Sequence, residues 1–130
     1  MNNTSNIQTV EMSYGRITKQ ADNLIYLFLH DQLSIDVAEA QAMVTDVRDL
    51  TQSDQIRLLV SYGVNSDLTF GAQRYFANVT GFTHLAFVVH NRMQAEVGQF
   101  LVSMLRVFKS NYEFKLFYDV EAAENWLRKQ

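Results

Sequence analysis

Three histidines are the residues of this chain best suited to bind a metal ion or to carry a proton. His30 and His90 end the apolar runs "LIYLFLH" and "FTHLAFVVH", and Tyr62 ends a third run, "IRLLVSY". The carboxyl ends of parallel strands share one edge of a sheet, where ligands of open α/β sheets bind, so these three side chains form a candidate ligand site. His84 begins its run and is expected at the opposite edge, so no three-histidine zinc site is predicted. Strand-end histidines are also common surface residues, and we predict neither a metal nor a cofactor.

Hydroxyl and carboxylate groups gather in "NSDLTFGAQ", residues 65–73, just before a short helical pattern. A hydroxyl at Thr69 can accept a hydrogen bond from a free N–H of the first helical turn. A phosphate at the same place would also be stabilised, because it would meet those N–H groups and the helix dipole. Ser66, Asp67, Thr69 and Gly71 therefore form a candidate interaction or switch region, in which the helix cap is the favoured role of Thr69.

The signatures of common enzymes are missing from the sequence. The chain has no cysteine, no Gly-rich phosphate loop, no Gly-x-Ser-x-Gly and no His-Glu-x-x-His. Asp31, Asp36 and Glu39 cluster near one predicted rim, but carboxylates at a helix start normally cap the helix or face solvent. We therefore expect a protein that is not an enzyme.

Hydrophobic periodicity predicts the scaffold that positions these residues. In residues 7–20, Val10, Met12 and Tyr14 lie at period two, and Gly15 then allows a bulge or bend before Ile17. The segment therefore indicates one long or broken strand, which is expected to form a hairpin with Leu24–His30. The later strands are predicted at Ile56–Tyr62, Phe82–His90 and Phe114–Tyr118. Helices are predicted at Ser34–Leu50 with Ser34 as its cap, at 69–79, at Met93–Lys109, where Gly98 allows close approach to a neighbour, and after the cap Asp119. This order, β-β-α-β-α-β-α-β-α, predicts an open, mostly parallel α/β sheet with right-handed crossovers and an N-terminal antiparallel hairpin.

Composition narrows the classes of function. The 130 residues are 48% hydrophobic and 19% charged, which is typical of one globular domain spanning 1–130, with residues 1–6 expected to be flexible. Eleven basic residues are scattered among 14 acidic ones, for a net charge of −3, which argues against nucleic-acid binding. No apolar run reaches the ~20 residues that cross a bilayer, and the start lacks a signal-peptide pattern, so we expect a cytoplasmic protein without stable membrane insertion.

Several phrases resemble a known family. "LLVSYGVNSDLTFGAQRYFA", "HLAFVVH" and "LFYDVEAAENWLRK" are similar to the SpoIIAA-like domains, a group that contains STAS domains and small bacterial relatives of unknown role. The likeness spans Tyr14 to Lys129 and is clearest around Ala72, Tyr75 and Phe76. It implies an open sheet with a right-handed βα superhelix and a role in protein interaction or ligand sensing. The same broad fold includes the CRAL-TRIO lipid-binding domains.

The family resemblance also bears on the switch region. In STAS anti-sigma-factor antagonists, a serine in an Asp-Ser-Ser-Gly-like loop accepts phosphate from a partner kinase. Thr69 here stands near the aspartate of that motif, with Phe70 and Gly71 near its two serines, so the phosphoacceptor position is missing. A phospho-switched antagonist is therefore the third choice of function.

Two other functions rank above it. The first is a non-enzymatic STAS-like regulatory module that binds a protein partner or a second copy of the chain. The second is a carrier or sensor of a small apolar ligand or lipid, held between the sheet and helix Met93–Lys109. The apolar residues of that helix span a wide arc and need a cover: Val97, Phe100, Leu101, Met104, Leu105, Val107 and Phe108. Aromatic residues around the second crossover could line the pocket or fill the core: Tyr62, Phe70, Tyr75, Phe76 and Phe82. An apolar cavity would favour the ligand-binding function.

Overall fold

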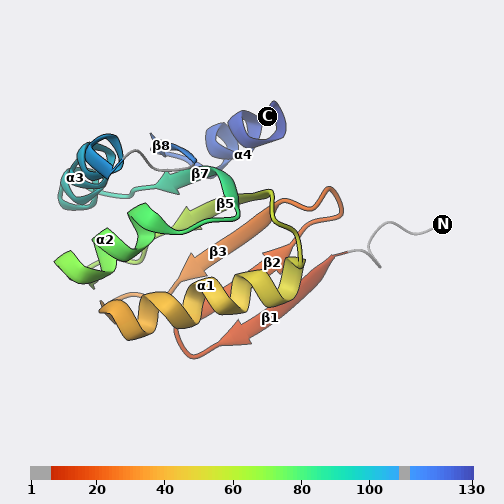
Figure 1. The fold of residues 1–130 in the computed structure, drawn as a ribbon, viewed down its shortest axis with the longest axis horizontal. Coiled ribbons are helices and arrows are strands. Elements are labelled where there is room, and N and C mark those ends of the chain that lie inside the picture. The colour runs from red at the N-terminus through yellow and green to blue at the C-terminus, as the bar shows by residue number, and fades with distance from the viewer. Residues whose placement is uncertain (1–6, 109–111) are drawn as a thin grey trace.

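A mixed six-stranded sheet runs through the middle of the fold, and the computed structural model describes residues 7–108 and 112–130 (Figure 1). In spatial order the strands are β1 (Gln8–Met12), β2 (Gly15–Lys19), β3 (Ile25–Leu29), β5 (Ile56–Ser61), β7 (Phe82–Val88) and β8 (Glu113–Phe117). The pairs β1–β2 and β2–β3 are antiparallel, and the later strands pair in parallel. The predicted α/β class, mostly parallel after an N-terminal antiparallel hairpin, is confirmed.

Three helices cover one face of the sheet and a fourth covers the other (Figure 1). They are α1 (Val37–Thr51), α2 (Phe70–Asn78), α3 (Arg92–Phe108) and α4 (Val120–Arg128). From β3 to β8 the chain crosses the sheet in one direction, so crossovers of the same hand place α1, α2 and α3 on the same face. The main core lies under these helices. A smaller core under α4 joins Ala123 and Leu127 to Leu59 and Val88.

The N-terminal segment departs from the prediction of a single long or broken strand. It reverses direction at Ser13 and Tyr14, so that Met12 pairs with Gly15 and the segment forms the hairpin β1–β2 by itself. Gly15 has φ = 156°, and a Cβ there would overlap the carbonyl oxygen of Phe28. The glycine thus permits both the turn and the close approach of β3. The apolar pattern changes phase between Tyr14 and Ile17, and such a change fits a bend at Gly15 as well as a tight turn, so the pattern alone did not reveal the reversal.

The start of α1 requires a second correction. The predicted cap, Ser34, lies instead in a short strand, β4 (Ser34–Ile35), which pairs in parallel with β6 (Asp67–Leu68). Asp36 is the N-cap: its carboxylate accepts from the N–H of Val37 at 2.8 Å, and its own N–H donates to the Glu39 carboxylate at 2.9 Å. This capping box satisfies donors at both positions, whereas Ser34 lies too early in the chain to do so.

The other predicted helices lie where periodicity placed them. The predicted caps of α2 and α4 are confirmed, since Thr69 accepts from the Ala72 N–H at 3.1 Å and Asp119 accepts from the Ala122 N–H at 2.8 Å. Gly98 is buried in α3, and a Cβ there would overlap Leu116, so the glycine allows the predicted close approach. Within the described residues, no helix has both the length and the apolar character needed to cross a membrane.

Some sequence predictions concern residues outside the described part of the chain. These are the flexibility of residues 1–6, the end of the third helix at Lys109, and the apolar arc formed by the side chains of Val97, Phe100, Leu101, Met104, Leu105, Val107 and Phe108.

Candidate functional site

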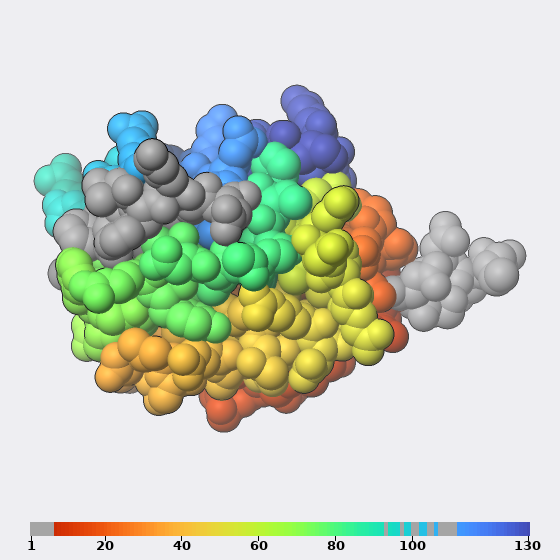
Figure 2. All heavy atoms as spheres, viewed as in Figure 1, coloured from red at the N-terminus to blue at the C-terminus, as the bar shows by residue number. Residues whose placement is uncertain are grey.

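An apolar cavity of about 70 Å³ lies between the sheet and helices α1 and α2. Strands β3, β5 and β7 contribute Leu27, Val60 and Phe87 to its wall, and α1 and α2 contribute Val44 and Phe76. The two helices lie against each other over this face, from orange and yellow to green in Figure 2. The cavity is therefore built from residues of the main core, and three of the five aromatic residues expected to line a pocket or fill the core lie in its wall: Tyr62, Phe76 and Phe82. Among the described residues its helical wall comes from α1 and α2, whereas sequence analysis placed the ligand under the third helix.

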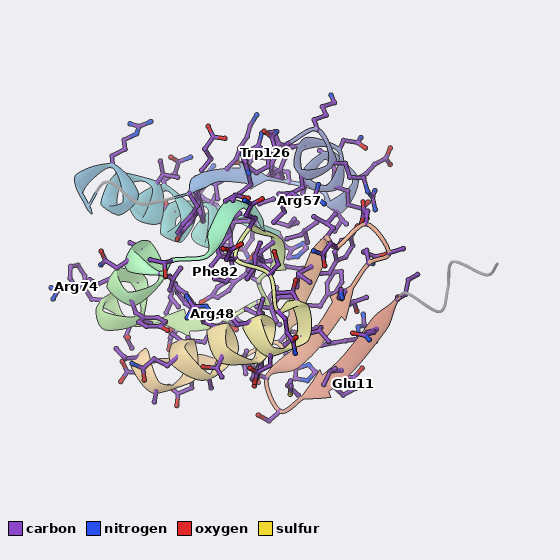
Figure 3. The ribbon with its side chains drawn as sticks, turned by 45° about the vertical axis from the view of Figure 1, so that its right-hand side comes forward. Glu11, Arg48, Arg57, Arg74, Phe82 and Trp126 are labelled. Carbon is purple, nitrogen blue, oxygen red and sulfur yellow. The ribbon has the colours of Figure 1, made fainter. Side chains whose placement is uncertain are left out.

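One end of the cavity lies near the start of β7. Phe82, labelled in Figure 3, lines it there. Arg48 of α1 lies close by, since a Cβ on the neighbouring Gly81 would stand 4.0 Å from its Nε. The guanidinium of Arg48 donates to the carbonyl oxygen of Thr80. Arg48 therefore ties α1 to the segment between α2 and β7, which stabilises that end of the wall.

Two tyrosines carry the only hydroxyls among the described residues that line the cavity. Tyr112 donates a hydrogen bond of 2.6 Å to the carbonyl oxygen of Phe76. Tyr62 is 2% exposed, and within the described part of the chain its hydroxyl has no hydrogen-bond partner. Burial, and after it the charge of Asp67, raises the pKa of Tyr62 to about 12, so this hydroxyl keeps its proton at neutral pH. Tyr62 is thus a residue of the cavity wall whose buried hydroxyl has no hydrogen-bond partner among the described residues.

The candidate edge site, His30, Tyr62 and His90, divides into a buried part and an exposed part. Each residue comes at or just after the carboxyl end of β3, β5 or β7. Tyr62 points into the core, whereas His30 and His90 are exposed. The ring of His90 forms a hydrogen bond of 3.1 Å with the Ser61 hydroxyl, which holds it at the surface.

A buried glutamine that sequence analysis did not single out supports this edge. Gln94, in the first turn of α3, accepts from the N–H of His90 at 2.7 Å and donates to the carbonyl oxygens of Tyr62 and Gly63 at 3.2 and 2.7 Å. It therefore fixes the backbone that carries the Tyr62 ring. In the sequence, Gln94 is marked only by being an uncharged polar residue in the first turn of an amphipathic helix.

The candidate switch region connects the first two crossovers. The Ser66 hydroxyl accepts from the N–H of Leu33 at 3.0 Å, and Asp67 pairs with Ser34 through β4 and β6. The Thr69 hydroxyl caps α2 and also donates to the Asp36 carboxylate at 2.8 Å, so it links the starts of both helices.

The link between Thr69 and Asp36 shifts the pKa of a carboxyl group, and the two helices pack closely beside it. The hydrogen bond from Thr69, and after it the one from the Val37 N–H, lowers the pKa of Asp36. Gly71 also lies close to α1, since a Cβ there would contact the Val37 side chain at 2.9 Å. The region has a clear structural role, which is to hold α1 and α2 together beside the cavity.

The remaining candidate acids and histidine have structural partners. Asp31 accepts from the N–H of Val64 at 2.9 Å, and Glu39 belongs to the capping box of α1. His84 lies near the start of β7, where it pairs with Glu113 at 2.9 Å and contacts the ring of Trp126. Trp126 belongs to α4 and is labelled in Figure 3. Within residues 7–108 and 112–130, no group of three or more histidine, aspartate or glutamate residues is placed to hold a metal ion.

Comparison with known protein families gives a match that covers most of the chain. Residues 18–130 match the model of a family described as a domain of unknown function (DUF7793). No curated protein and no solved structure matches the chain.

Proposed function

The chain belongs to this family, and we propose that it is a non-enzymatic binding domain that holds a small apolar ligand between its sheet and helices α1 and α2. The cavity carries the proposal, because protein interiors normally contain few voids larger than a water molecule. Left empty, 70 Å³ of apolar void would cost about 1.7 kcal/mol at ~24 cal/mol per Å³. A ligand that fills this space recovers that free energy on binding.

The size and chemistry of the wall define the ligand. The volume is about half that of an engineered cavity of about 150 Å³ that stays dry and binds benzene. The described wall offers leucine, valine, isoleucine, methionine and phenylalanine side chains and the two tyrosines. The ligand is therefore a small apolar molecule, or the apolar end of a larger one.

The predicted protein-binding role remains a second proposal, supported by one surface feature. Tyr118 is 73% exposed and follows β8, which ends the sheet within the described residues. Exposed tyrosines are common at the centre of protein interfaces. In this proposal the domain is a SpoIIAA-like or STAS-like cytoplasmic module, and the order of its parallel strands, with three helices on one face, supports that finer assignment. Thr69 acts in it as a structural residue, not as a phosphoacceptor.

Xenon binding tests the ligand-binding proposal directly. In methyl NMR spectra recorded under xenon pressure, the expected shifts are those of methyl groups in the cavity wall, such as Leu27 and Val44. Val60→Ile adds a methyl group inside the cavity and is expected to reduce these shifts. Val88→Ile adds the same group on the opposite face of the sheet and is the matched control, because Val88 belongs to the core under α4.

Thermal melts of the two variants complete the test. Val60→Ile is expected to keep or raise the melting temperature, since it fills space, whereas Val88→Ile is expected to lower it, since Val88 is fully buried in a packed core. Xenon shifts scattered over the surface, or equal loss of shifts in both variants, would contradict the proposal.

A further inference from the structure

The Tyr62 hydroxyl differs from every other buried polar group in the described part of the chain. Three buried side-chain atoms there have no hydrogen-bond partner: Tyr62 Oη, Gln73 Oε1 and His84 Nδ1. Of these three residues only Tyr62 lines the cavity. Buried polar groups in proteins are nearly always satisfied, so an unsatisfied one at a cavity wall indicates a missing partner.

The second tyrosine of the wall shows what a satisfied hydroxyl looks like at this site. Tyr112 is buried to a similar extent, yet its hydroxyl donates to the carbonyl oxygen of Phe76. The same wall therefore pairs one phenol with the protein and leaves the other with its donor unused. Apolar packing alone would be served as well by phenylalanine at position 62.

The protonation state of Tyr62 determines whether its partner must accept or donate the hydrogen bond. With its pKa raised to about 12, the phenol is neutral and donates at physiological pH. A ligand that accepts this hydrogen bond needs an oxygen with a free lone pair. The charge of Asp67 acts on the same hydroxyl, and a second negative charge placed there would be repelled.

We infer that Tyr62 is the polar anchor of the cavity and that the ligand is a small, neutral, mainly apolar molecule with one hydrogen-bond-accepting oxygen, such as a ketone. This inference rests on the proposed ligand-binding function and adds the class of ligand and its specificity-determining residue. It excludes carboxylates, including fatty acids in their ionised form, from the anchor position.

Three probes of nearly the same planar shape separate these possibilities. Acetone carries an acceptor oxygen, isobutene replaces that oxygen with a CH₂ group, and acetate carries a full negative charge. Methyl NMR titrations of the intact protein give a dissociation constant for each probe. The decisive quantity is the ratio of the isobutene constant to the acetone constant, because hydration differences between the probes cancel when the ratio is compared between variants.

Tyr62→Phe is expected to lower this ratio about fivefold, by weakening acetone binding while leaving isobutene binding within about twofold. The matched control is Tyr112→Phe, which removes a hydroxyl already bonded to Phe76 and is expected to leave the ratio unchanged. Acetate is expected to show no binding at neutral pH. Circular dichroism of both variants establishes that they are folded.

The outcomes distinguish the anchor from the proposed function itself. If isobutene binds in the cavity and Tyr62→Phe leaves the ratio unchanged, the anchor is wrong while the apolar site stands. If acetate binds as tightly as acetone, the neutral class of ligand is wrong. If no probe shifts the methyl groups of the wall, the proposed function and this inference both fail.

Discussion

Replacing Tyr62 with phenylalanine should stabilise the ligand-free protein, although most substitutions in a core destabilise it. The phenol is buried, and within the described residues its hydroxyl has no partner, so the folded state carries a desolvated group that water would satisfy in the unfolded chain. Phenylalanine keeps the ring and its contact with Phe87, whose centroid lies 5.5 Å away. Only the unsatisfied oxygen is lost.

The change in unfolding free energy expected for Tyr62→Phe can be compared with that expected for Tyr112→Phe. An unsatisfied buried hydroxyl costs about 1–3 kcal/mol, and the lower figure applies here because removing the oxygen also enlarges the cavity slightly. Tyr112→Phe instead breaks a hydrogen bond to Phe76 and should cost about 1 kcal/mol. For a chain of 130 residues, an unfolding entropy of ~2.1 cal/mol/K per residue converts 1 kcal/mol into about 4 °C.

Calorimetry of the two variants, after dialysis to remove bound molecules, provides the assay. Tyr62→Phe is expected to melt about 4 °C above the wild-type protein and Tyr112→Phe about 4 °C below it. Urea titrations should give the same order of unfolding free energies. If Tyr62→Phe loses as much stability as Tyr112→Phe, the Tyr62 hydroxyl is satisfied in the free protein and the reasoning behind the anchor is refuted.

Three further predictions concern the caps, the tyrosine and a close backbone contact. Thr69→Ala removes the acceptor of a first-turn N–H and should cost about 1 kcal/mol in thermal melts, while Thr69→Ser keeps the cap. Thr69→Asp, which capping alone would tolerate, places a second carboxylate beside Asp36 and should be less stable than the serine variant; equal stability would contradict the link between the helices. The pKa of Tyr62 is about 12 in the folded state and about 10 in the unfolded chain, so only the folded state keeps this proton between the two values. The unfolding free energy should therefore fall as pH rises from about 10 to 12, and it should fall less steeply in Tyr62→Phe. An identical slope in both proteins would count against the raised pKa. Gly63→Ala should lower the unfolding free energy by about 2 kcal/mol or more in urea titrations, because its Cβ would overlap the backbone of His30. A variant that unfolds at the same urea concentration as the wild-type protein would show that the two loops can move apart without a loss of stability.

Local patterns were sufficient to predict most of the elements. The buried stripe of α1, which includes Ala40, Val44 and Val47, lies at helical spacing. The caps Thr69 and Asp119 were also predictable, because a side-chain acceptor and the N–H that it binds are three residues apart. In the N-terminal segment, by contrast, the alternation changes phase between Tyr14 and Ile17, a pattern that fits one bent strand as well as two strands joined by a turn.

The sequence by itself determined the order of the four helices and of the longer strands from β3 to β8, their apolar faces and the absence of common catalytic motifs, since each depends on residues close together in the chain. Only the tertiary structure decided which side chains meet across the fold. The hydrogen bond from Thr69 to Asp36 joins residues 33 positions apart, and the cavity wall brings residues as distant as Leu27 and Phe114 together. Whether a buried hydroxyl such as that of Tyr62 finds a partner, and whether apolar side chains fill the space between them, depends on shape and distance in three dimensions, which no periodicity along the chain encodes.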